Sequence, residues 1–227
     1  MGKTAEYLIR NLGPLTGEQQ EILRQSSAAV IGCGGLGGYV VEELVRIGVG
    51  RLLVFDPDVF SPSNCNRQLY ATQKALGQNK AEVARERAAA IHPLSSVQAY
   101  PTDFRRACSA DDVNIDVVID CLDDIAARLD LASLCQQRHL PLVHGAVHGW
   151  YGQVGVQLPG TDLLKRLYPG PVQPKPAKPP SVLSFTVAVV ASLQACEAVK
   201  LLLNLPSPLH DCCMQLDLKS CDFEIIA

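Results

Sequence analysis

A glycine-rich turn lies between a short apolar run, Ala28–Ile31, and a helix-like stretch, Tyr39–Ile47. A second apolar run follows and is closed by Asp56, twenty-four residues after the first glycine of the turn. Strand, glycine turn, helix, strand and acid in this order are typical of a βαβ unit that binds a nucleotide. Glycines allow backbone N–H groups to approach phosphate closely, and the N-terminus of a helix favours an anion. The turn includes Gly32, Gly34, Gly35 and Gly37.

The composition indicates a globular protein. The chain has 227 residues, of which 48% are hydrophobic and 19% are charged, enough for one domain with a substantial core. Its net charge of −3 provides no electrostatic surface for nucleic acid, so we expect no nucleic-acid partner. Met1–Arg10 carries no signal peptide, and the nine cysteines form no Cys-x-x-Cys pair. We therefore expect reduced thiols in a cytoplasmic protein.

One segment, Val182–Leu205, is long and apolar enough to require a membrane check. Gln194, Glu197 and Lys200 interrupt it, and a spanning helix would place these polar groups in lipid at a cost of several kcal/mol. We expect a buried helix on the sheet or at a dimer contact, and no membrane partner.

Apolar runs alternate with helical stretches along the chain. The predicted strands are Ala28–Ile31, Leu52–Phe55, Val97–Tyr100, Val117–Asp120 and Leu142–His144. The helices between them are Gly37–Ile47, Asn79–Ile91 and Ile125–Arg138. Further strands with antiparallel partners are expected at Gln153–Gln157, Met214–Leu218 and Phe223–Ile226. This pattern predicts an α/β fold: a Rossmann-like, mostly parallel sheet with helices on both faces and antiparallel strands at the C-terminal end.

Two segments lie outside this alternation. Residues 1–25 are expected to form an N-terminal helical arm, because Thr16 and Gln19 make a capping box for a helix that reaches Gln25. Residues 159–180 are expected to form a crossover loop, because Pro169–Pro180 contains six prolines and reads as an exposed, extended linker.

Two cations follow the second predicted strand closely. Arg67 and Lys80 lie thirteen residues apart, just beyond the acid that would hold a ribose. A dehydrogenase needs no such pair. An enzyme that handles a triphosphate does, because fixed cations offset the repulsion between polyphosphate and an incoming anion.

Together with other motifs along the chain, these residues make the sequence resemble the MoeB/ThiF/HesA family, the bacterial relatives of ubiquitin-activating enzymes. The similarity covers roughly residues 5–205, and its motifs occur in the family order. They are Gly32-x-Gly-Gly-x-Gly37, Asp56-x-Asp58, Ser63-Asn-x-Asn-Arg-Gln68, Gly77-x-x-Lys80, Asp120-Cys-x-Asp123 and Ala191-Ser-Leu-Gln-Ala-x-Glu-Ala-x-Lys200.

The resemblance implies a single ThiF-type ATP-binding domain over residues 1–227. It also implies an ATP- and Mg²⁺-dependent adenylyltransferase. Such enzymes adenylate a C-terminal carboxylate, usually the Gly-Gly tail of a ubiquitin-like sulfur carrier protein, and release pyrophosphate. Catalysis of this kind depends mostly on positioning and on cations placed around the phosphates.

Roles for individual residues follow from the same resemblance. Asp56 matches the acid on the ribose hydroxyls, and Asp123 matches the acid that coordinates Mg²⁺. Asp124 stands where asparagine is common, and either stronger metal binding or a changed nucleotide contact would account for it. The residues expected around ATP are Gly32, Gly34, Gly35, Gly37, Asp56, Ser63, Asn64, Arg67, Lys80, Asp123 and Asp124, and those expected to act in catalysis are Arg67, Lys80, Asp123 and Arg10.

Arg10 resembles the family arginine that reaches across a two-fold interface into the partner's ATP site. If it does so here, the protein works as a homodimer; an exposed terminal arginine is the alternative.

The chain also departs from the family pattern. Many members bind zinc through two Cys-x-x-Cys pairs, whereas here Cys212 and Cys213 are adjacent and chelate one ion poorly, so zinc is not expected. The predicted crossover loop has no cysteine, which argues against a covalent step there. His144 and His148 flank the tripeptide Gly145-Ala-Val and are interpreted as structural or substrate-groove histidines.

Three alternatives to a carrier-adenylating enzyme remain. The first is a tRNA threonylcarbamoyladenosine dehydratase-like enzyme, which the acidic net charge disfavours. The second is a non-catalytic partner subunit that retains the ATP fold, against which the intact Arg67, Lys80 and Asp123 count. The third is an NAD dehydrogenase, which leaves the two cations unexplained.

Overall fold

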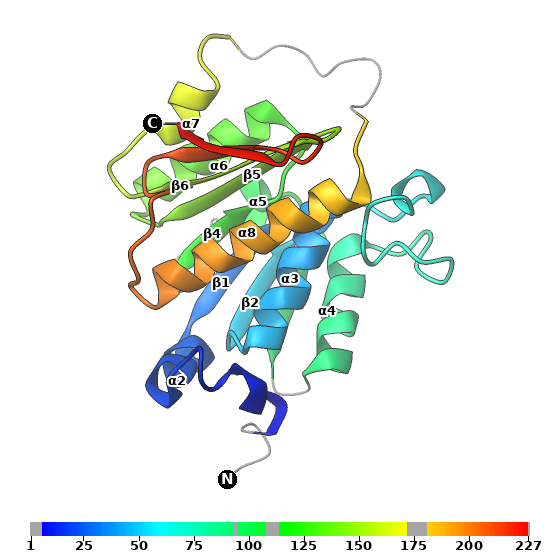
Figure 1. Ribbon diagram of the computed structural model, residues 1–227. Coiled ribbons are helices and arrows are strands. Elements are labelled where there is room, and N and C mark those ends of the chain that lie inside the picture. The colour runs from blue at the N-terminus through cyan, green and yellow to red at the C-terminus, as the bar shows by residue number, and fades with distance from the viewer. Residues whose placement is uncertain (1–5, 93–94, 108–113, 172–180, 227) are drawn as a thin grey trace.

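The computed structural model describes residues 6–92, 95–107, 114–171 and 181–226. In this part of the chain, eight strands form one sheet in the order β3-β2-β1-β4-β5-β6-β7-β8 (Figure 1). Pairing is parallel from β3 to β5 and antiparallel from β5 to β8. The predicted α/β class, with antiparallel strands at the C-terminal end, is confirmed.

The strand bounds agree closely with the apolar runs. The parallel strands are β1 (Ser27–Ile31), β2 (Arg51–Phe55), β3 (Ser96–Tyr100), β4 (Val117–Asp120) and β5 (Leu142–His148). The antiparallel strands are β6 (Tyr151–Gln157), β7 (Cys213–Asp217) and β8 (Asp222–Ile226). β5 runs on to His148, past the predicted end at His144, because its second half pairs with β6.

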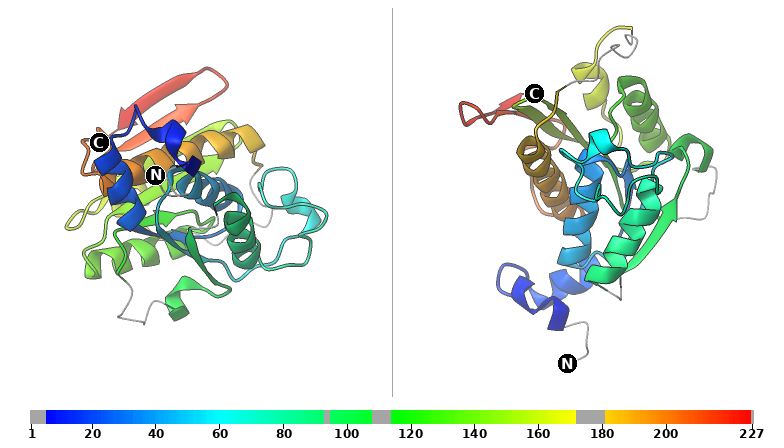
Figure 2. Two further views of the ribbon diagram at one scale, coloured as in Figure 1. Left: turned by 90° about the horizontal axis from the view of Figure 1, so that it is seen from below. Right: turned by 90° about the vertical axis from the view of Figure 1, so that its right-hand side faces the viewer.

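Helices cover both faces of the sheet (Figure 2). The α-helices are α2 (Gly17–Gln25), α3 (Gly35–Ile47), α4 (Lys80–Ile91), α5 (Phe104–Ala107), α6 (Ile125–Gln137), α7 (Leu163–Leu167) and α8 (Ser184–Leu202). Two short 3₁₀ helices are η1 (Ile9–Asn11) and η2 (Pro62–Asn64). Right-handed crossovers place α3 and α4 on one face, since the strand order runs outward from β1 to β3, and place α6 on the other.

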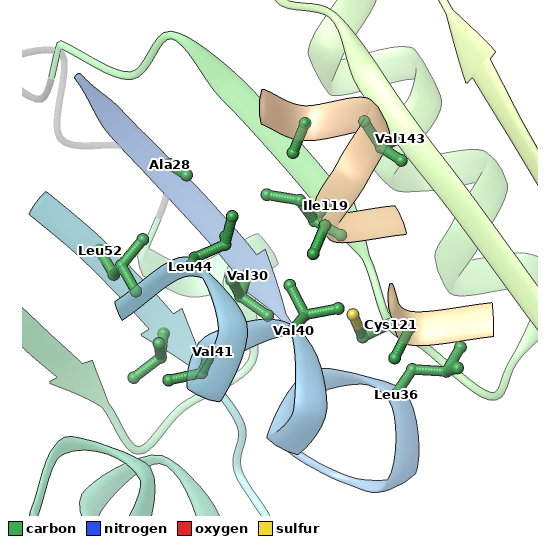
Figure 3. Packing of buried hydrophobic residues seen from close by; sticks show 14 of the residues in the cluster. Ala28, Val30, Leu36, Val40, Val41, Leu44, Leu52, Ile119, Cys121 and Val143 are labelled. Carbon is green, nitrogen blue, oxygen red and sulfur yellow. The ribbon is translucent and has the colours of Figure 1, made fainter. Parts of the chain in front are cut away.

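Each face has its own hydrophobic core. On the first face, α3, α4 and α8 pack against one side of the sheet, and Val40 and Leu44 of α3 lie over Val30 of β1 (Figure 3). On the second face, α6 and α7 contribute Leu131 and Leu164 to a separate cluster. Strands β1 and β4, which are paired on both edges within the sheet, are therefore buried on both faces.

Helix α8 is the segment that required the membrane check. By length and composition it could cross a membrane, but half of its most apolar window is buried inside the protein. It packs along α3 and over β5 and β6 (Figure 1). This is the predicted buried helix on the sheet.

The N-terminal helix is confirmed, and the crossover loop is corrected in part. The Thr16 hydroxyl accepts a hydrogen bond from the Gln19 N–H, and the Gln19 side chain accepts one from the Thr16 N–H, as a capping box requires. Within residues 159–180, however, α7 is a helix with Leu163 and Leu164 buried. The expectation of a loop fails there because residues 160–168 lack proline and supply apolar side chains to the core. Residues 172–180 lie outside the described chain.

Candidate nucleotide site

The glycine turn is folded so tightly that side chains are excluded at two positions. Gly32 has φ +97°, and a Cβ there would lie 2.7 Å from the Cys121 carbonyl oxygen. A Cβ on Gly37 would lie 1.8 Å from the Gly32 carbonyl oxygen. The turn thus brings the end of β1, the start of α3 and the loop after β4 into contact, at the edge of the sheet where α/β proteins bind ligands.

Helix α3 begins within this turn. Gly34 is its N-cap and, among the described residues, no side chain caps this end. The N-terminus of α3 therefore offers backbone donors and the positive end of its dipole to an anion. A Cβ on Gly34 would meet the Gln68 amide nitrogen at 3.3 Å, and one on Gly35 would meet Val187 of α8 at 3.3 Å.

Asp56 lies directly behind the turn. Its carboxylate accepts hydrogen bonds from the Cys33 N–H at 2.7 Å and the Asp58 N–H at 2.8 Å. Only 5% of the residue is exposed, and this burial raises the pKa of the carboxyl, while nearby Lys80 acts in the opposite direction. Asp56 thus holds the turn through the hydrogen bond to Cys33. Both carboxylate oxygens keep lone pairs that could accept from ribose hydroxyls. Ribose binding by Asp56 stays a prediction.

Lys80 is buried at the start of α4. The preceding residue, Asn79, caps the helix by accepting from Ala81 and Glu82 N–H groups. The Asn79 amide also donates to the carbonyl oxygens of Asp56 and Asp58, which fixes the helix start against the end of β2. The Lys80 ammonium lies 3.1 Å from the Asp58 carboxylate. A desolvated cation is thus held beside Asp56, as a phosphate-binding lysine would be.

The segment around η2 holds the other predicted phosphate residues. Asn64 is buried, and its side-chain oxygen accepts from the Ser61 N–H at 3.0 Å. The Ser63 hydroxyl lies 2.9 Å from the Ser61 hydroxyl. Arg67 is partly exposed and donates to the Ser63 carbonyl and to the Asn66 side chain. Asn64 therefore has a local structural role, and phosphate binding by these residues stays a prediction.

Asp123 and Asp124 follow β4 in the turn to α6. Asp124 is the N-cap of α6, because its carboxylate accepts from the Ala127 N–H at 2.9 Å. This cap gives Asp124 a local structural role, which asparagine could fill equally well, so its contact with the metal or the nucleotide stays a prediction. Asp123 is exposed at the carboxyl edge of the sheet.

Among the described residues, no group of three or more His, Cys, Asp or Glu side chains could hold a metal ion by itself. Mg²⁺ on a nucleotide usually needs only one or two carboxylates in addition to phosphate oxygens. The exposed carboxylate of Asp123, a hard oxygen donor, fits that chemistry.

A buried polar network at the end of β4 and the adjoining middle of β5 was missed from the sequence. Asp120 and His144 are fully buried, and the His144 Nδ1 lies 2.7 Å from the Asp120 carboxylate. Arg128 of α6 and Tyr168, the C-cap of α7, complete the network. His144 is thus a satisfied structural histidine, in agreement with one of the two interpretations offered above. Exposed His148 ends β5.

Arg10 lies far from this site within the chain. It is exposed in η1, and its neighbour Asn11 donates to the Ile47 carbonyl at the C-terminal end of α3. The glycine turn is at the other end of α3, a helix of 13 residues, or about 20 Å. Arg10 could reach an ATP site only in another copy of the chain.

Comparison with known proteins agrees with these features. The ThiF family model matches residues 8–227. The sulfur carrier protein adenylyltransferase of Thermus thermophilus is 36% identical over 219 residues, which cover 90% of this chain and 78% of that protein. The molybdopterin-synthase adenylyltransferase of Escherichia coli is 32% identical over 212 residues, covering 90% and 84%.

Among solved structures, E. coli MccB with ATP matches 92% of this chain with a TM-score of 0.76 at 18% identity, which shows a common fold. This chain spans 65% of the length of that structure. The resemblance drawn from the motifs is confirmed: the chain belongs to the ThiF family.

Proposed function

We propose that this protein is an ATP-dependent adenylyltransferase that activates the C-terminal carboxylate of a ubiquitin-like sulfur carrier protein. The observation that carries the proposal is the buried Lys80 ammonium beside Asp56 and the glycine turn. A buried lysine charge is costly unless it is paired, and the Asp58 partner of Lys80 is mostly exposed. A triphosphate bound at the N-terminus of α3 would supply the anion that this charge suits. The activities of the relatives in the same family agree with this assignment.

The chemistry follows from the charges involved. An oxygen of the carrier carboxylate forms a bond to the α-phosphorus of ATP, the bond from that phosphorus to the bridging oxygen breaks, and pyrophosphate leaves with the electron pair. Both reactants are anions, so Lys80 and Arg67 would offset their repulsion. Asp123 is the residue that would hold Mg²⁺, and the ion supplies further neutralisation of the phosphates.

The remaining features of the proposal concern the partners and the setting. The carrier would end in Gly-Gly, the protein would work as a homodimer that exchanges Arg10, and the setting would be the cytoplasm. Residues 1–227 would act as one ATP-binding domain. In this proposal the protein binds no structural zinc and forms no covalent bond to the carrier through a cysteine.

The direct test is to mix the protein, Mg-ATP and each Gly-Gly-ending small protein of the host, and to look for carrier–AMP by intact mass. Carrier–AMP with one carrier, lost with Lys80→Met and with a carrier lacking its last glycine, supports the proposal. If every carrier stays unmodified while bulk tRNA stimulates ATP hydrolysis, the dehydratase-like alternative replaces it. ATP binding by calorimetry without any turnover would indicate a non-catalytic partner subunit.

A further inference from the structure

Tyr168 connects two parts of the molecule that are distant in sequence. It caps the C-terminus of α7, directly before Pro169 and the proline-rich stretch. Its hydroxyl lies 2.9 Å from Arg128 Nη1, 2.7 Å from the Gln153 amide nitrogen and 3.0 Å from His144 Nε2. The C-terminal end of α7 is thereby tied to α6, β5 and β6.

The direction of each hydrogen bond is fixed by chemistry. The Asp120 carboxylate can only accept, so His144 donates from Nδ1, and its Nε2 is left as an acceptor. Burial lowers the pKa of His144, which favours this neutral form. Arginine and the Gln153 amide nitrogen can only donate, so the Tyr168 oxygen accepts from both. The Tyr168 O–H is then the donor to His144 Nε2, an acceptor that the Gln153 amide nitrogen also reaches at 3.1 Å. The Tyr168 hydroxyl therefore bonds Arg128 and His144 at the same time.

The other end of the network is the turn that carries Asp123. Both backbone polar groups of Leu122 are held: its N–H donates to the Asp120 carboxylate at 3.0 Å, and its carbonyl accepts from Arg128 Nη2 at 2.5 Å. Arg128 Nε lies 3.6 Å from the same carboxylate and has no hydrogen-bond partner among the described residues. The guanidinium is therefore oriented by its two Nη groups: Nη1 donates to Tyr168, and Nη2 donates to the carbonyl oxygens of Leu122 and, at 3.3 Å, Gly145.

We propose that Tyr168 is a positioning residue for Asp123, acting through Arg128 and His144 on the Leu122 turn. The inference rests on the proposed function, in which Asp123 would hold the metal of Mg-ATP. It connects the C-terminal end of α7 to the turn that carries the proposed metal-binding acid.

The test compares Tyr168→Phe with the wild-type protein. The variant keeps the aromatic ring, which stands 5.7 Å from the His144 ring at 88°, and removes only the hydroxyl. Mn²⁺ binding is measured by electron paramagnetic resonance in the presence of a non-hydrolysable ATP analogue, and analogue binding is measured separately in EDTA. We expect the Mn²⁺ affinity to fall about 10-fold, as for other groups that orient a metal ligand. Analogue affinity in EDTA should be unchanged.

A second variant and a double variant separate positioning from general damage. Arg128→Lys keeps the positive charge but cannot donate to Tyr168 and the Leu122 carbonyl at the same time, so we expect a similar loss of Mn²⁺ affinity. If Tyr168→Phe does not fold, this variant tests the proposal in its place. The defects should not add in the double variant, because both residues act on one turn. Tyr100→Phe is the matched control, since its hydroxyl bonds the exposed Gln98 side chain at 3.1 Å.

The possible outcomes are distinct. Wild-type Mn²⁺ affinity in both single variants, or defects that add, would overturn the role of Tyr168 and leave the proposed function standing. A wild-type protein that binds neither the analogue nor Mn²⁺ and forms no carrier–AMP would overturn the proposed function, and this inference with it.

Discussion

The Lys80 ammonium lies 3.1 Å from the Asp58 carboxylate, but the two side chains differ in exposure: only 9% of the Lys80 side chain is exposed, compared with 68% of the Asp58 side chain. A pair with one exposed partner is worth about 0–1 kcal/mol in most proteins. The buried cation is thus held by a weak and displaceable anion. A phosphate group placed at the glycine turn could take the place of Asp58 beside Lys80.

The first prediction concerns this lysine. Lys80→Met keeps most of the side-chain volume and removes the charge, so the fold should survive while carrier–AMP formation falls by about 10²–10³. The measurement is the rate of carrier–AMP formation, with the melting temperature as a check on folding. Lys74→Met, at an exposed position in the preceding loop, is the control and should keep the wild-type rate. Equal rates in the two variants would remove Lys80 from the reaction.

The second prediction concerns the close approach inside the glycine turn. In Gly37→Ala the new methyl group would lie 1.8 Å from the Gly32 carbonyl oxygen, so the turn must open. We expect a loss of about 1–3 kcal/mol or more in the free energy of unfolding, and a clear loss of ATP affinity. Chemical denaturation and calorimetry measure the two effects.

Gly17→Ala is the matched control for that substitution. Gly17 begins α2, and among the described residues no heavy atom lies within 4 Å of a Cβ built there. Alanine is the better helix former, so stability should stay the same or rise by about 0.4–1 kcal/mol. A Gly37→Ala protein as stable as this control would show that the turn adapts without difficulty.

The fold could be predicted from the sequence to a large extent, because periodicity and glycine placement are local signals. The missed extension of β5 shows the limit. Gly145 resembles a strand break in sequence, but in the structure it is a close approach: a Cβ there would lie 2.3 Å from the Gln194 side chain of α8. That requirement depends on a helix about fifty residues further along the chain and leaves no local signal.

The candidate site was predictable in its backbone frame but not in its polar network. Asp124 directly before a predicted helix carried a usable signal, since aspartate is a favoured N-cap. The network itself joins Asp120 to His144 and Arg128 to Tyr168, pairs that are 24 and 40 residues apart. No spacing rule links such residues, because the sheet order and the position of α7 bring them together.

The third prediction uses the buried histidine. Burial lowers the pKa of His144 below its usual value of about 6.5, so the unfolded chain takes up a proton before the folded protein does. The free energy of unfolding should therefore fall as the pH drops below about 6.5. The charged and titratable groups that face the ring are Asp120, Arg128 and Tyr168.

His144→Asn should flatten this dependence, because it removes the group that titrates. Denaturation curves at a series of pH values measure the slope, which is compared with that of His148→Asn at the exposed end of β5. Burial also raises the pKa of Asp56, and this changes the free energy of unfolding with pH in the opposite direction. Both variants contain Asp56, so its effect cancels in the comparison. Equal slopes in the two variants would mean that His144 is not the source of the dependence.

The last prediction concerns Arg10, which cannot reach the glycine turn of its own chain across the length of α3. If each site is completed by Arg10 of a second copy, Arg10→Ala and Lys80→Ala chains should each be inactive alone and active when mixed. A mixed dimer then contains one intact site, so random pairing restores roughly a quarter of the wild-type rate per chain. The mixture must be formed by co-expression or by unfolding and refolding, so that subunits exchange. An Arg10→Ala protein with the wild-type rate, or a mixture no more active than its components, would make Arg10 an ordinary surface residue.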